Sequence, residues 1–171
     1  VTTARALAQA LDIPAVAVPT LRSFVYADPG CTDVICPLFD ARRSEVYAAA
    51  YLYEENGNAL EIVPGGAYPL AEYLKLLFAA AAAHGRKSLV FYGDGTGVYG
   101  ADVTQAAAAA GFAAEIRDEV QQASYVATLG LELYWAGKAV PYGLLKPDYM
   151  RESEAKRQLK LKQENATKRC E

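Results

Sequence analysis

Residues 34–53 read VICPLFDARRSEVYAAAYLY, and this stretch decides the fold. The apolar run 34–39 predicts a buried strand, and residues 46–53 alternate as a half-buried strand does. The link between the two strands is formed by Asp40, Ala41, Arg42, Arg43, Ser44 and Glu45. Tight hairpin links usually take Gly, Asn or Asp, because these residues tolerate positive φ at little cost. A charged link therefore indicates either a function or a specific network of salt bridges.

The composition is that of a globular protein, with 53% hydrophobic and 22% charged residues in a length of 171 that fits one domain. No apolar run approaches the roughly 20 residues that span a bilayer, so we expect no membrane-spanning helix. The three cysteines lack C-x-x-C spacing, which is typical of reduced thiols and predicts a cytoplasmic location. The chain opens with Val1 in a helical pattern, which indicates a fragment of a longer protein.

The rest of the sequence predicts helices and strands in alternation. The expected helices are 2–10, 20–27 with Thr20 as N-cap, 70–84, 102–110 and 124–136. The other expected strands are 15–18, 60–63, 88–92 and 113–116, with a type I′ turn at 55–58 and a sheet break at Gly65-Gly66. From the charged hairpin onward, the α/β order is β-β-β-α-β-α-β-α. A mixed five-stranded sheet of this order is the ribonuclease-H-like lobe of the actin, Hsp70 and sugar-kinase superfamily, and by itself it assigns no activity.

Two further features bear on chemistry. His84 is the single His, which excludes a paired-His zinc site on this chain, and its place before Gly85 at a helix end favours capping. The segment 93–97 reads GDGTG and follows a strand, where backbone N–H groups can hold a phosphate. However, the Lys of a P-loop is absent, and such turns are common without a ligand. The candidate nucleotide-proximal residues are Gly93, Gly95, Thr96 and Gly97.

The charged link matters because nucleotide-binding lobes of this superfamily wrap the phosphates with the corresponding hairpin. Small residues are needed there, since the backbone must approach the phosphate oxygens closely. The bulk of Arg42 and Arg43 would fill that space, and Glu45 would repel an anion. We therefore interpret the link as a partner interface or a structural ion-pair network, with a solvated turn as the alternative. The residues assigned to it are Asp40, Arg42, Arg43, Glu45 and Tyr47.

The chain resembles the bacterial TsaB (YeaZ) family of tRNA threonylcarbamoyladenosine biosynthesis. The resemblance rests on DARRSEVY at 40–47 and PDYMR at 147–151, where the family shows D-A-R-x-x-E-V-Y and P-x-Y-L-R. The stretch ALAQALDIPAVAVPTL at 6–21 and the segment 93–97 support it. Met150 stands where Leu is common, and the N-terminal lobe and glycine-rich segment of the family are not present.

The resemblance implies three parts. Residues 1–30 would be a remnant of the N-terminal lobe (helix, strand, helix), residues 31–150 the C-terminal ribonuclease-H-like lobe, and residues 151–171 a basic tail, helical or disordered. In that family the pairing surface is helical and lies mostly in the N-terminal lobe, so only the first helix here would retain part of it. The residues of this remnant pairing helix are Thr3, Arg5, Leu7 and Ala8.

The implied function is that of a non-catalytic scaffold or activating subunit, with no catalytic or metal-binding residue on this chain. In that family the protein pairs with the catalytic subunit TsaD and recruits the ATPase TsaE, and the complex adds threonylcarbamoyl to the adenosine next to the anticodon of tRNA. ATP and a metal ion are then expected on the partner subunits, no cofactor on this chain, and no membrane partner; a homodimer is a further expectation. The alternatives are an ATP-dependent phosphotransferase of the sugar-kinase type, with 93–97 at the adenosine, and a glycoprotease-like peptidase, which would need a metal.

Overall fold

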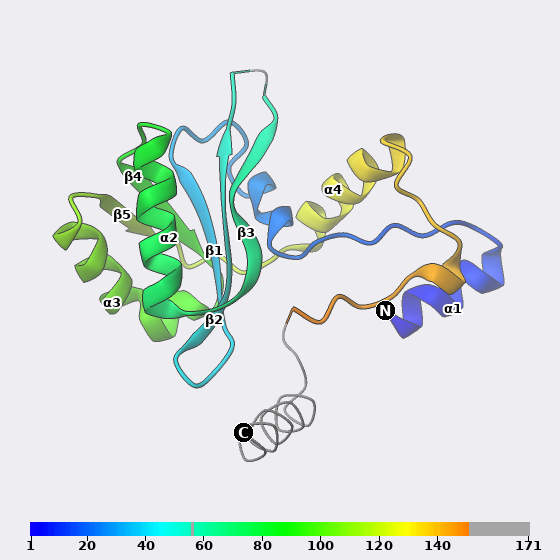
Figure 1. Ribbon diagram of the computed structural model, residues 1–171. Coiled ribbons are helices and arrows are strands. Elements are labelled where there is room, and N and C mark those ends of the chain that lie inside the picture. Colours follow the sequence, from blue (N-terminus) through cyan, green and yellow to red (C-terminus); the bar gives the residue numbers. More distant parts are fainter. Residues whose placement is uncertain (56, 151–171) are drawn as a thin grey trace, which may run out of the picture.

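The computed structural model describes residues 1–55 and 57–150, and its centre is a mixed sheet of five strands (Figure 1). The strands are β1 (Val34–Asp40), β2 (Glu45–Tyr53), β3 (Ala59–Pro69), β4 (Ser88–Tyr92) and β5 (Ala113–Ile116). Their order is β3-β2-β1-β4-β5. The first three strands pair antiparallel, whereas β4 is parallel to both β1 and β5. This arrangement confirms the predicted ribonuclease-H-like class.

Helices cover both faces of the sheet. On one face, α2 (Leu70–Ala83) and α3 (Gly95–Ala109) pack against Val34, Cys36 and Leu38 of β1. On the other face lies the short 3₁₀ helix η1 (Arg22–Tyr26), whose Phe24 packs in one cluster with Ile35. The helix α4 (Ala123–Trp135) packs beside η1. Because β1 is buried on both faces, its sequence is a continuous apolar run rather than an alternating one.

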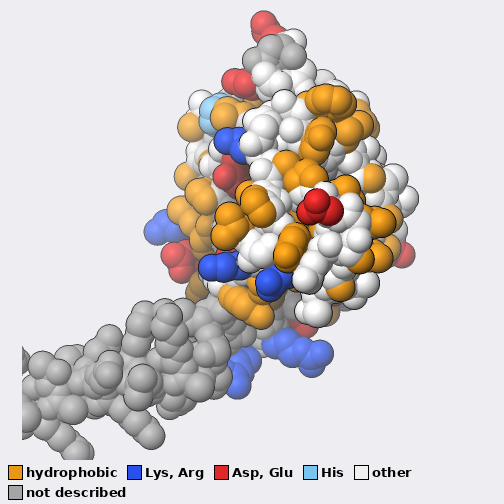
Figure 2. All heavy atoms as spheres, turned by 90° about the vertical axis from the view of Figure 1, so that its right-hand side faces the viewer, with side chains coloured by type: hydrophobic (Ala, Val, Ile, Leu, Met, Phe, Trp, Pro, Cys, Tyr) orange, Lys and Arg blue, Asp and Glu red, His pale blue; other side chains and the backbone are white. Residues whose placement is uncertain are grey.

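The first helix lies away from the sheet. In Figure 1, α1 (Thr2–Leu11) and the 3₁₀ helix η2 (Tyr142–Leu144) lie together on the right. Their chain segments meet where Ala15 and Val140 exchange two backbone hydrogen bonds of 2.8 Å. We call residues 1–19 and 136–146 the arm. Figure 2 views the molecule from this side and shows hydrophobic side chains at the surface, and Leu7 and Leu144 of the arm are among the exposed ones.

Several expected elements are confirmed, namely the helices at 2–10, 70–84 and 124–136 and the strands at 88–92 and 113–116. The expected strand at 15–18 is wrong. Among the described residues, only Ala15 of this segment makes an isolated β-bridge, with Val140. A strand would need a partner along its whole length. The expected helix at 20–27 is the shorter η1. Its three-residue repeat turns Leu21 and Phe24 to the same side, toward the sheet.

Thr20 does not act as an N-cap through its side chain. The residue before η1 is Leu21, and the Thr20 carbonyl instead accepts a hydrogen bond of 2.8 Å from the Ser23 hydroxyl. The predicted boundary at residue 30 stays a prediction, although η1, which precedes it, packs on the sheet of the expected C-terminal lobe. The predicted basic tail at 151–171, and with it Arg151 of the PDYMR motif, lies outside the described residues.

The third strand and its hairpin also differ from expectation. β3 does not stop before Gly65-Gly66 but continues to Pro69, and Gly66 pairs with Ala48 beyond a register shift. The register shift accommodates Gly65 and Gly66 within the strand, so the break that they predicted does not occur. In the hairpin, the Gly57 N–H donates to the Glu54 carbonyl at 2.9 Å, so Gly57, at φ 81°, closes the turn instead of sitting at its centre. Asn56 of the predicted type I′ turn lies outside the described residues.

The helix expected at 102–110 begins much earlier, at Gly95. The glycines of 93–97 lower intrinsic helix propensity, which is why the sequence predicted a loop. Tertiary contacts override that preference, since Gly95 and Thr96 are buried and Val103 and Ala107 anchor the helix on the sheet. The N-terminus of α3 is thereby placed next to the end of β1.

Candidate functional site

The charged link adopts a left-handed backbone. Arg42, Arg43 and Ser44 have φ values of 63°, 58° and 60°, the region that Gly enters freely and other residues avoid. The turn is closed by the Glu45 N–H, which donates to the Arg42 carbonyl at 3.1 Å. Each residue in this conformation costs about 1–2 kcal/mol. Backbone strain that the surrounding structure maintains is a marker of functional sites.

Hydrogen bonds through Asp40 hold the link in place. Its carboxylate oxygen Oδ1 accepts from the backbone N–H of Arg42 at 2.7 Å and from the hydroxyl of Tyr99 at 3.1 Å. Its own N–H donates to the carboxylate of Asp94, just before α3, at 3.3 Å. Desolvation and the hydrogen bond to Asp40 raise the pKa of Tyr99 above its ordinary value. The structure thus brings Asp40 and Arg42 together through a carboxylate-to-backbone bond.

The second anchor of the link is α2. The N–H of Leu70, the first residue of α2, donates to the carbonyl of Ser44 at 3.1 Å. The link is therefore fixed between the N-terminal ends of α2 and α3. Arg42, Arg43 and Ser44 are exposed, and Glu45 is half-buried. The ion-pair role predicted for Arg43 and Glu45 stays a prediction.

The glycines of the candidate nucleotide-proximal loop have a packing role. A Cβ on Gly93 would lie 2.6 Å from the Leu38 carbonyl oxygen, and a Cβ on Gly95 would lie 2.8 Å from it. The Thr96 hydroxyl donates to the Gly93 carbonyl at 2.7 Å, whereas Gly97 faces open space. Two of the three glycines thus allow α3 to approach the backbone of β1. A nucleotide contact of this loop stays a prediction.

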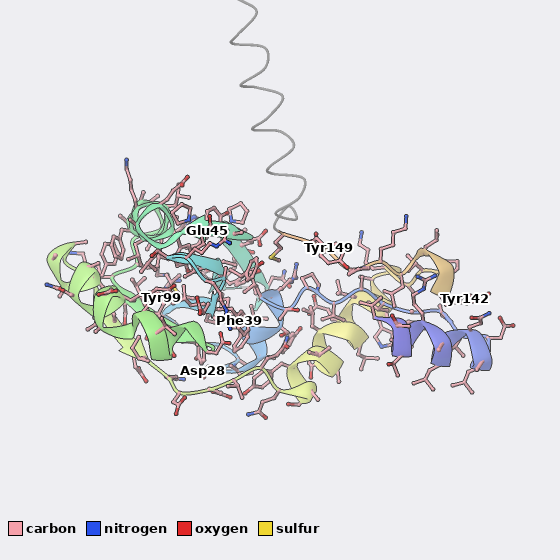
Figure 3. All side chains as sticks on the ribbon, turned by 90° about the horizontal axis from the view of Figure 1, so that it is seen from below. Asp28, Phe39, Glu45, Tyr99, Tyr142 and Tyr149 are labelled. Atoms are coloured by element: carbon pink, nitrogen blue, oxygen red, sulfur yellow. The ribbon has the colours of Figure 1, made fainter. Side chains whose placement is uncertain are left out.

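A pocket of about 390 Å³ lies at the base of the β1–β2 hairpin. It is lined by Thr20, Leu21, Phe39, Tyr47, Asp148, Tyr149 and Met150. Phe39 and Tyr47 are cross-strand partners at the base of the hairpin. Tyr149 enters from the segment that returns from the arm, and Figure 3 shows it on the side of the lobe that carries Phe39 and Glu45. The pocket therefore joins the DARRSEVY and PDYMR motifs, which are far apart in the sequence.

The sequence singled out Tyr47 as a site residue but missed Phe39, Tyr99 and Tyr149. Tyr149 carried a signal, because it belongs to the PDYMR motif, yet nothing in the sequence placed it beside Tyr47. Tyr99 carried none, since it falls in a segment predicted as irregular. Its role emerges only once α3 is seen to start at Gly95.

The residues of the predicted remnant pairing helix lie on α1, in the arm, apart from the link (Figure 1). Ala8 is buried at 5% exposure, whereas Leu7 is 59% exposed. Thr3 and Arg5 are exposed as well. α1 thus presents a partly apolar surface, and its part in pairing stays a prediction.

Further features concern metals and membranes. His84 is the C-cap residue of α2, as expected, and Gly85 follows it at φ 65°. Within residues 1–55 and 57–150, no three His, Cys, Asp or Glu side chains are grouped to hold a metal ion. In the same part of the chain, no helix has the length and apolarity to cross a membrane.

Comparison with known proteins identifies the family. A family model described as "TsaD: tRNA N6-adenosine threonylcarbamoyltransferase" matches residues 1–159. The tRNA threonylcarbamoyladenosine biosynthesis protein TsaB of Bacillus subtilis (strain 168) is 32% identical over 155 residues, which cover 91% of this chain and 63% of that protein. The chain belongs to this family as a TsaB (YeaZ) member.

Solved YeaZ structures share the fold of this TsaB-family chain. One is a crystal structure of an uncharacterized protein with similarity to peptidase YEAZ from Pseudomonas aeruginosa, with a TM-score of 0.64 and 23% identity over 88% of this chain. Another is YeaZ from Pseudomonas aeruginosa, with a TM-score of 0.59 and 19% identity over 86% of this chain. The chain spans 65% of each of these structures, so it covers less than two thirds of its TsaB and YeaZ relatives.

Proposed function

We propose that this TsaB-family chain is a non-catalytic scaffold or activating subunit of the machinery that adds threonylcarbamoyl to the adenosine next to the anticodon of tRNA. The name of the Bacillus subtilis relative, a tRNA threonylcarbamoyladenosine biosynthesis protein, supports this assignment. So does the family model, which is described as a tRNA N6-adenosine threonylcarbamoyltransferase.

The observation that carries the proposal is the strained, charged link. Two arginines occupy positions at φ 63° and 58° where Gly would relieve strain. Arg at these positions is explained if the guanidinium groups contact something that Gly could not, since Arg offers a planar set of donors to carboxylates and phosphates. Hydrogen bonds through Asp40, Leu70 and Tyr99 hold the backbone that carries these groups.

The partners follow from this assignment. The link is proposed to contact a TsaD-type catalytic subunit, with a TsaE-type ATPase and tRNA as further components of the complex. ATP and a metal ion are proposed to bind to those partner subunits, and this chain is proposed to bind no cofactor. We propose a cytoplasmic location for the complex, and a homodimer as a further form of the chain. The two alternatives, a phosphotransferase and a peptidase, are not favoured by the relatives found.

The test is reconstitution of tRNA modification. The chain is combined with a TsaD-type subunit, a TsaE-type ATPase, unmodified tRNA, threonine, bicarbonate, ATP and the enzyme that makes the threonylcarbamoyl adenylate. The modified nucleoside is then measured by mass spectrometry. Omitting the chain should abolish the product, and Arg42→Ala/Glu45→Ala should lower it about tenfold by weakening assembly.

Lys87→Ala is the matched control, because Lys87 is exposed and directly precedes β4, at the end of the sheet where β1 begins and opposite the link. It should leave the yield unchanged. Full modification without the chain would refute the proposed function. Full activity of Arg42→Ala/Glu45→Ala would show that the link does not contribute to this function.

A further inference from the structure

Another pocket, of about 550 Å³, lies at the end of the sheet opposite the link. Tyr53 at the end of β2 and Thr32 just before β1 line it, whereas the link joins the other ends of these two strands. In Figure 1 the β2–β3 hairpin, which also lines the pocket, is at the top and the link is at the bottom. Small-molecule sites usually have volumes of about 300–1,000 Å³. The pocket is therefore a candidate ligand site separate from the link.

Hydrogen bonds hold the walls of this pocket in place. Nη1 of Arg117 donates to the carboxylate of Asp28 at 2.8 Å, and the N–H of Cys31 donates to the Asp28 carbonyl at 3.1 Å. Across the pocket, the hydroxyl of Tyr53 donates to the carbonyl of Val25 in η1. A ligand that enters walls already fixed in this way loses little free energy to ordering the protein.

Two arginines line the pocket, and one of them has a buried donor without an acceptor. Nη2 of Arg22 lies 3.4 Å from the Glu132 carboxylate, but Nε of Arg22 is buried and makes no hydrogen bond within the described part of the chain. A buried donor left without an acceptor destabilises a protein, so an acceptor supplied by a ligand is favoured here. Nη1 of Arg86 donates to the Thr32 carbonyl at 3.1 Å, which uses one of the five donors of this guanidinium. The pocket thus offers charged donors to an anionic group such as a carboxylate.

Carboxylates give the lining a mixed charge. Glu132 already accepts hydrogen bonds on both oxygens, from Arg22 and from the hydroxyl of Tyr26. Glu54 and Glu55, which are exposed on the β2–β3 hairpin, also line the pocket. A ligand with negative charge alone would be repelled by Glu54 and Glu55, whereas an additional cationic group would be attracted to them. The lining therefore favours a zwitterion over a simple anion.

The rest of the lining is largely apolar and aromatic. Tyr26 and Tyr53 supply two rings, and Val25, Pro29 and Ala59 supply aliphatic surface. Both tyrosine hydroxyls already donate hydrogen bonds within the protein, so it is the rings that remain for contact with a ligand. Aromatic rings pack favourably against one another. The body of the ligand is therefore expected to be apolar and aromatic.

We propose that this pocket binds an α-amino acid with an aromatic side chain. The carboxylate of the ligand accepts hydrogen bonds from Arg86 and from Nε of Arg22, and its ammonium group faces Glu55 on the hairpin. The ring of the ligand packs against Tyr26 and Tyr53. This site goes beyond the scaffold function and does not depend on it, because none of its residues belongs to the link.

Isothermal titration calorimetry on the chain alone tests the charge of the ligand. The probes are L-phenylalanine, 3-phenylpropanoate, which lacks the ammonium group, and 2-phenylethylamine, which lacks the carboxylate. L-phenylalanine should bind saturably. Each analogue should bind about tenfold more weakly, because it loses one charge-assisted contact.

Three variants test the place of binding. Arg86→Gln should weaken the binding of L-phenylalanine about tenfold, since it removes the charge but keeps a donor for the Thr32 carbonyl. Ala59→Trp should abolish binding, because Ala59 lines the pocket and the larger side chain fills it without a change of charge. Arg5→Gln is the matched control, since Arg5 is exposed on α1 in the arm, and it should leave Kd unchanged. Thermal unfolding checks that each variant is folded.

The proposal is overturned if L-phenylalanine does not bind, or if 3-phenylpropanoate binds as tightly as L-phenylalanine. It is also overturned if folded Arg86→Gln or folded Ala59→Trp binds L-phenylalanine as the unchanged chain does. The calorimetry needs no partner subunit and no tRNA. Its failure therefore leaves the reconstitution result standing, and a failed reconstitution with intact binding of L-phenylalanine would refute the scaffold function alone.

Discussion

The hydroxyl of Tyr99 in α3 donates a hydrogen bond of 3.1 Å to the carboxylate of Asp40 at the end of β1. The same carboxylate oxygen accepts the N–H of Arg42, the first left-handed residue of the link. A helix on one face of the sheet therefore sets the conformation of the exposed hairpin. These hydrogen bonds tie the link to α3.

Removing the Tyr99 hydroxyl should loosen the link. The hydrogen bond from the Tyr99 hydroxyl to the Asp40 carboxylate is lost in Tyr99→Phe, so the urea midpoint of unfolding should fall. Urea unfolding measures the loss. The modification yield should fall with it, because the Asp40 carboxylate that accepts the Arg42 N–H loses its other hydrogen bond. Unchanged stability together with unchanged yield would show that Tyr99 does not support the link.

Relieving the backbone strain should stabilise the fold. Ser44 is at φ 60°, and Ser44→Gly should raise the free energy of unfolding by about 1 kcal/mol, since Gly adopts this conformation without a Cβ clash. The urea midpoint is the readout. Gly85→Ala is the opposite control, because Gly85 is at φ 65° in open space and Ala should cost about 1 kcal/mol there. Destabilisation by Ser44→Gly would refute the strain assigned to the link.

Two neighbouring glycines of α3 should respond oppositely to alanine. Gly95→Ala places a Cβ 2.8 Å from the Leu38 carbonyl oxygen and should destabilise the fold by about 1–3 kcal/mol. Gly97→Ala meets open space on the same helix and should stabilise it by about 0.5–1 kcal/mol. Thermal unfolding of the two variants, side by side, decides the matter. Equal effects would contradict the close approach of α3 to β1.

Stability should fall at alkaline pH. Burial is the main cause that raises the pKa of Tyr26 and of Tyr92 from 10.0 to about 12. Because the folded chain holds these protons more tightly than the unfolded chain, the stabilisation is fully present below pH 10 and is lost as the pH rises from 10 towards 12. Urea unfolding at about pH 8 and about pH 11, with the ultraviolet absorbance of tyrosinate as the titration signal, tests this.

Tyr92→Phe provides the control for the alkaline loss. Its stability should depend less on pH between 10 and 12, since one titrating hydroxyl is gone. It also removes a hydrogen bond of 3.2 Å from Arg117, so its stability near neutral pH should be slightly lower. An unfolding free energy that stays flat through this pH window in the unchanged chain would contradict the raised pKa values.

The strands and most helices were predictable because their signals are local. The apolar run at 34–39, the alternation at 46–53 and the periodic helix at 70–84 each define one element within a short window. Errors arose where distant contacts decide. The segment 15–18 has no partner strand among the described residues, and irregular pairing accommodates Gly65 and Gly66 within β3. Gly93 and Gly95 let α3 begin close against β1.

The sequence by itself determined the order of strands and helices, the charged composition of the link and the two motifs that mark the family. The tertiary structure alone decided that Arg42, Arg43 and Ser44 are left-handed, that Tyr99 holds Asp40, and that Tyr47 meets Tyr149 in one pocket. The physical reason is range: local periodicity and propensity act over a few residues, whereas these features depend on packing between segments distant in the chain.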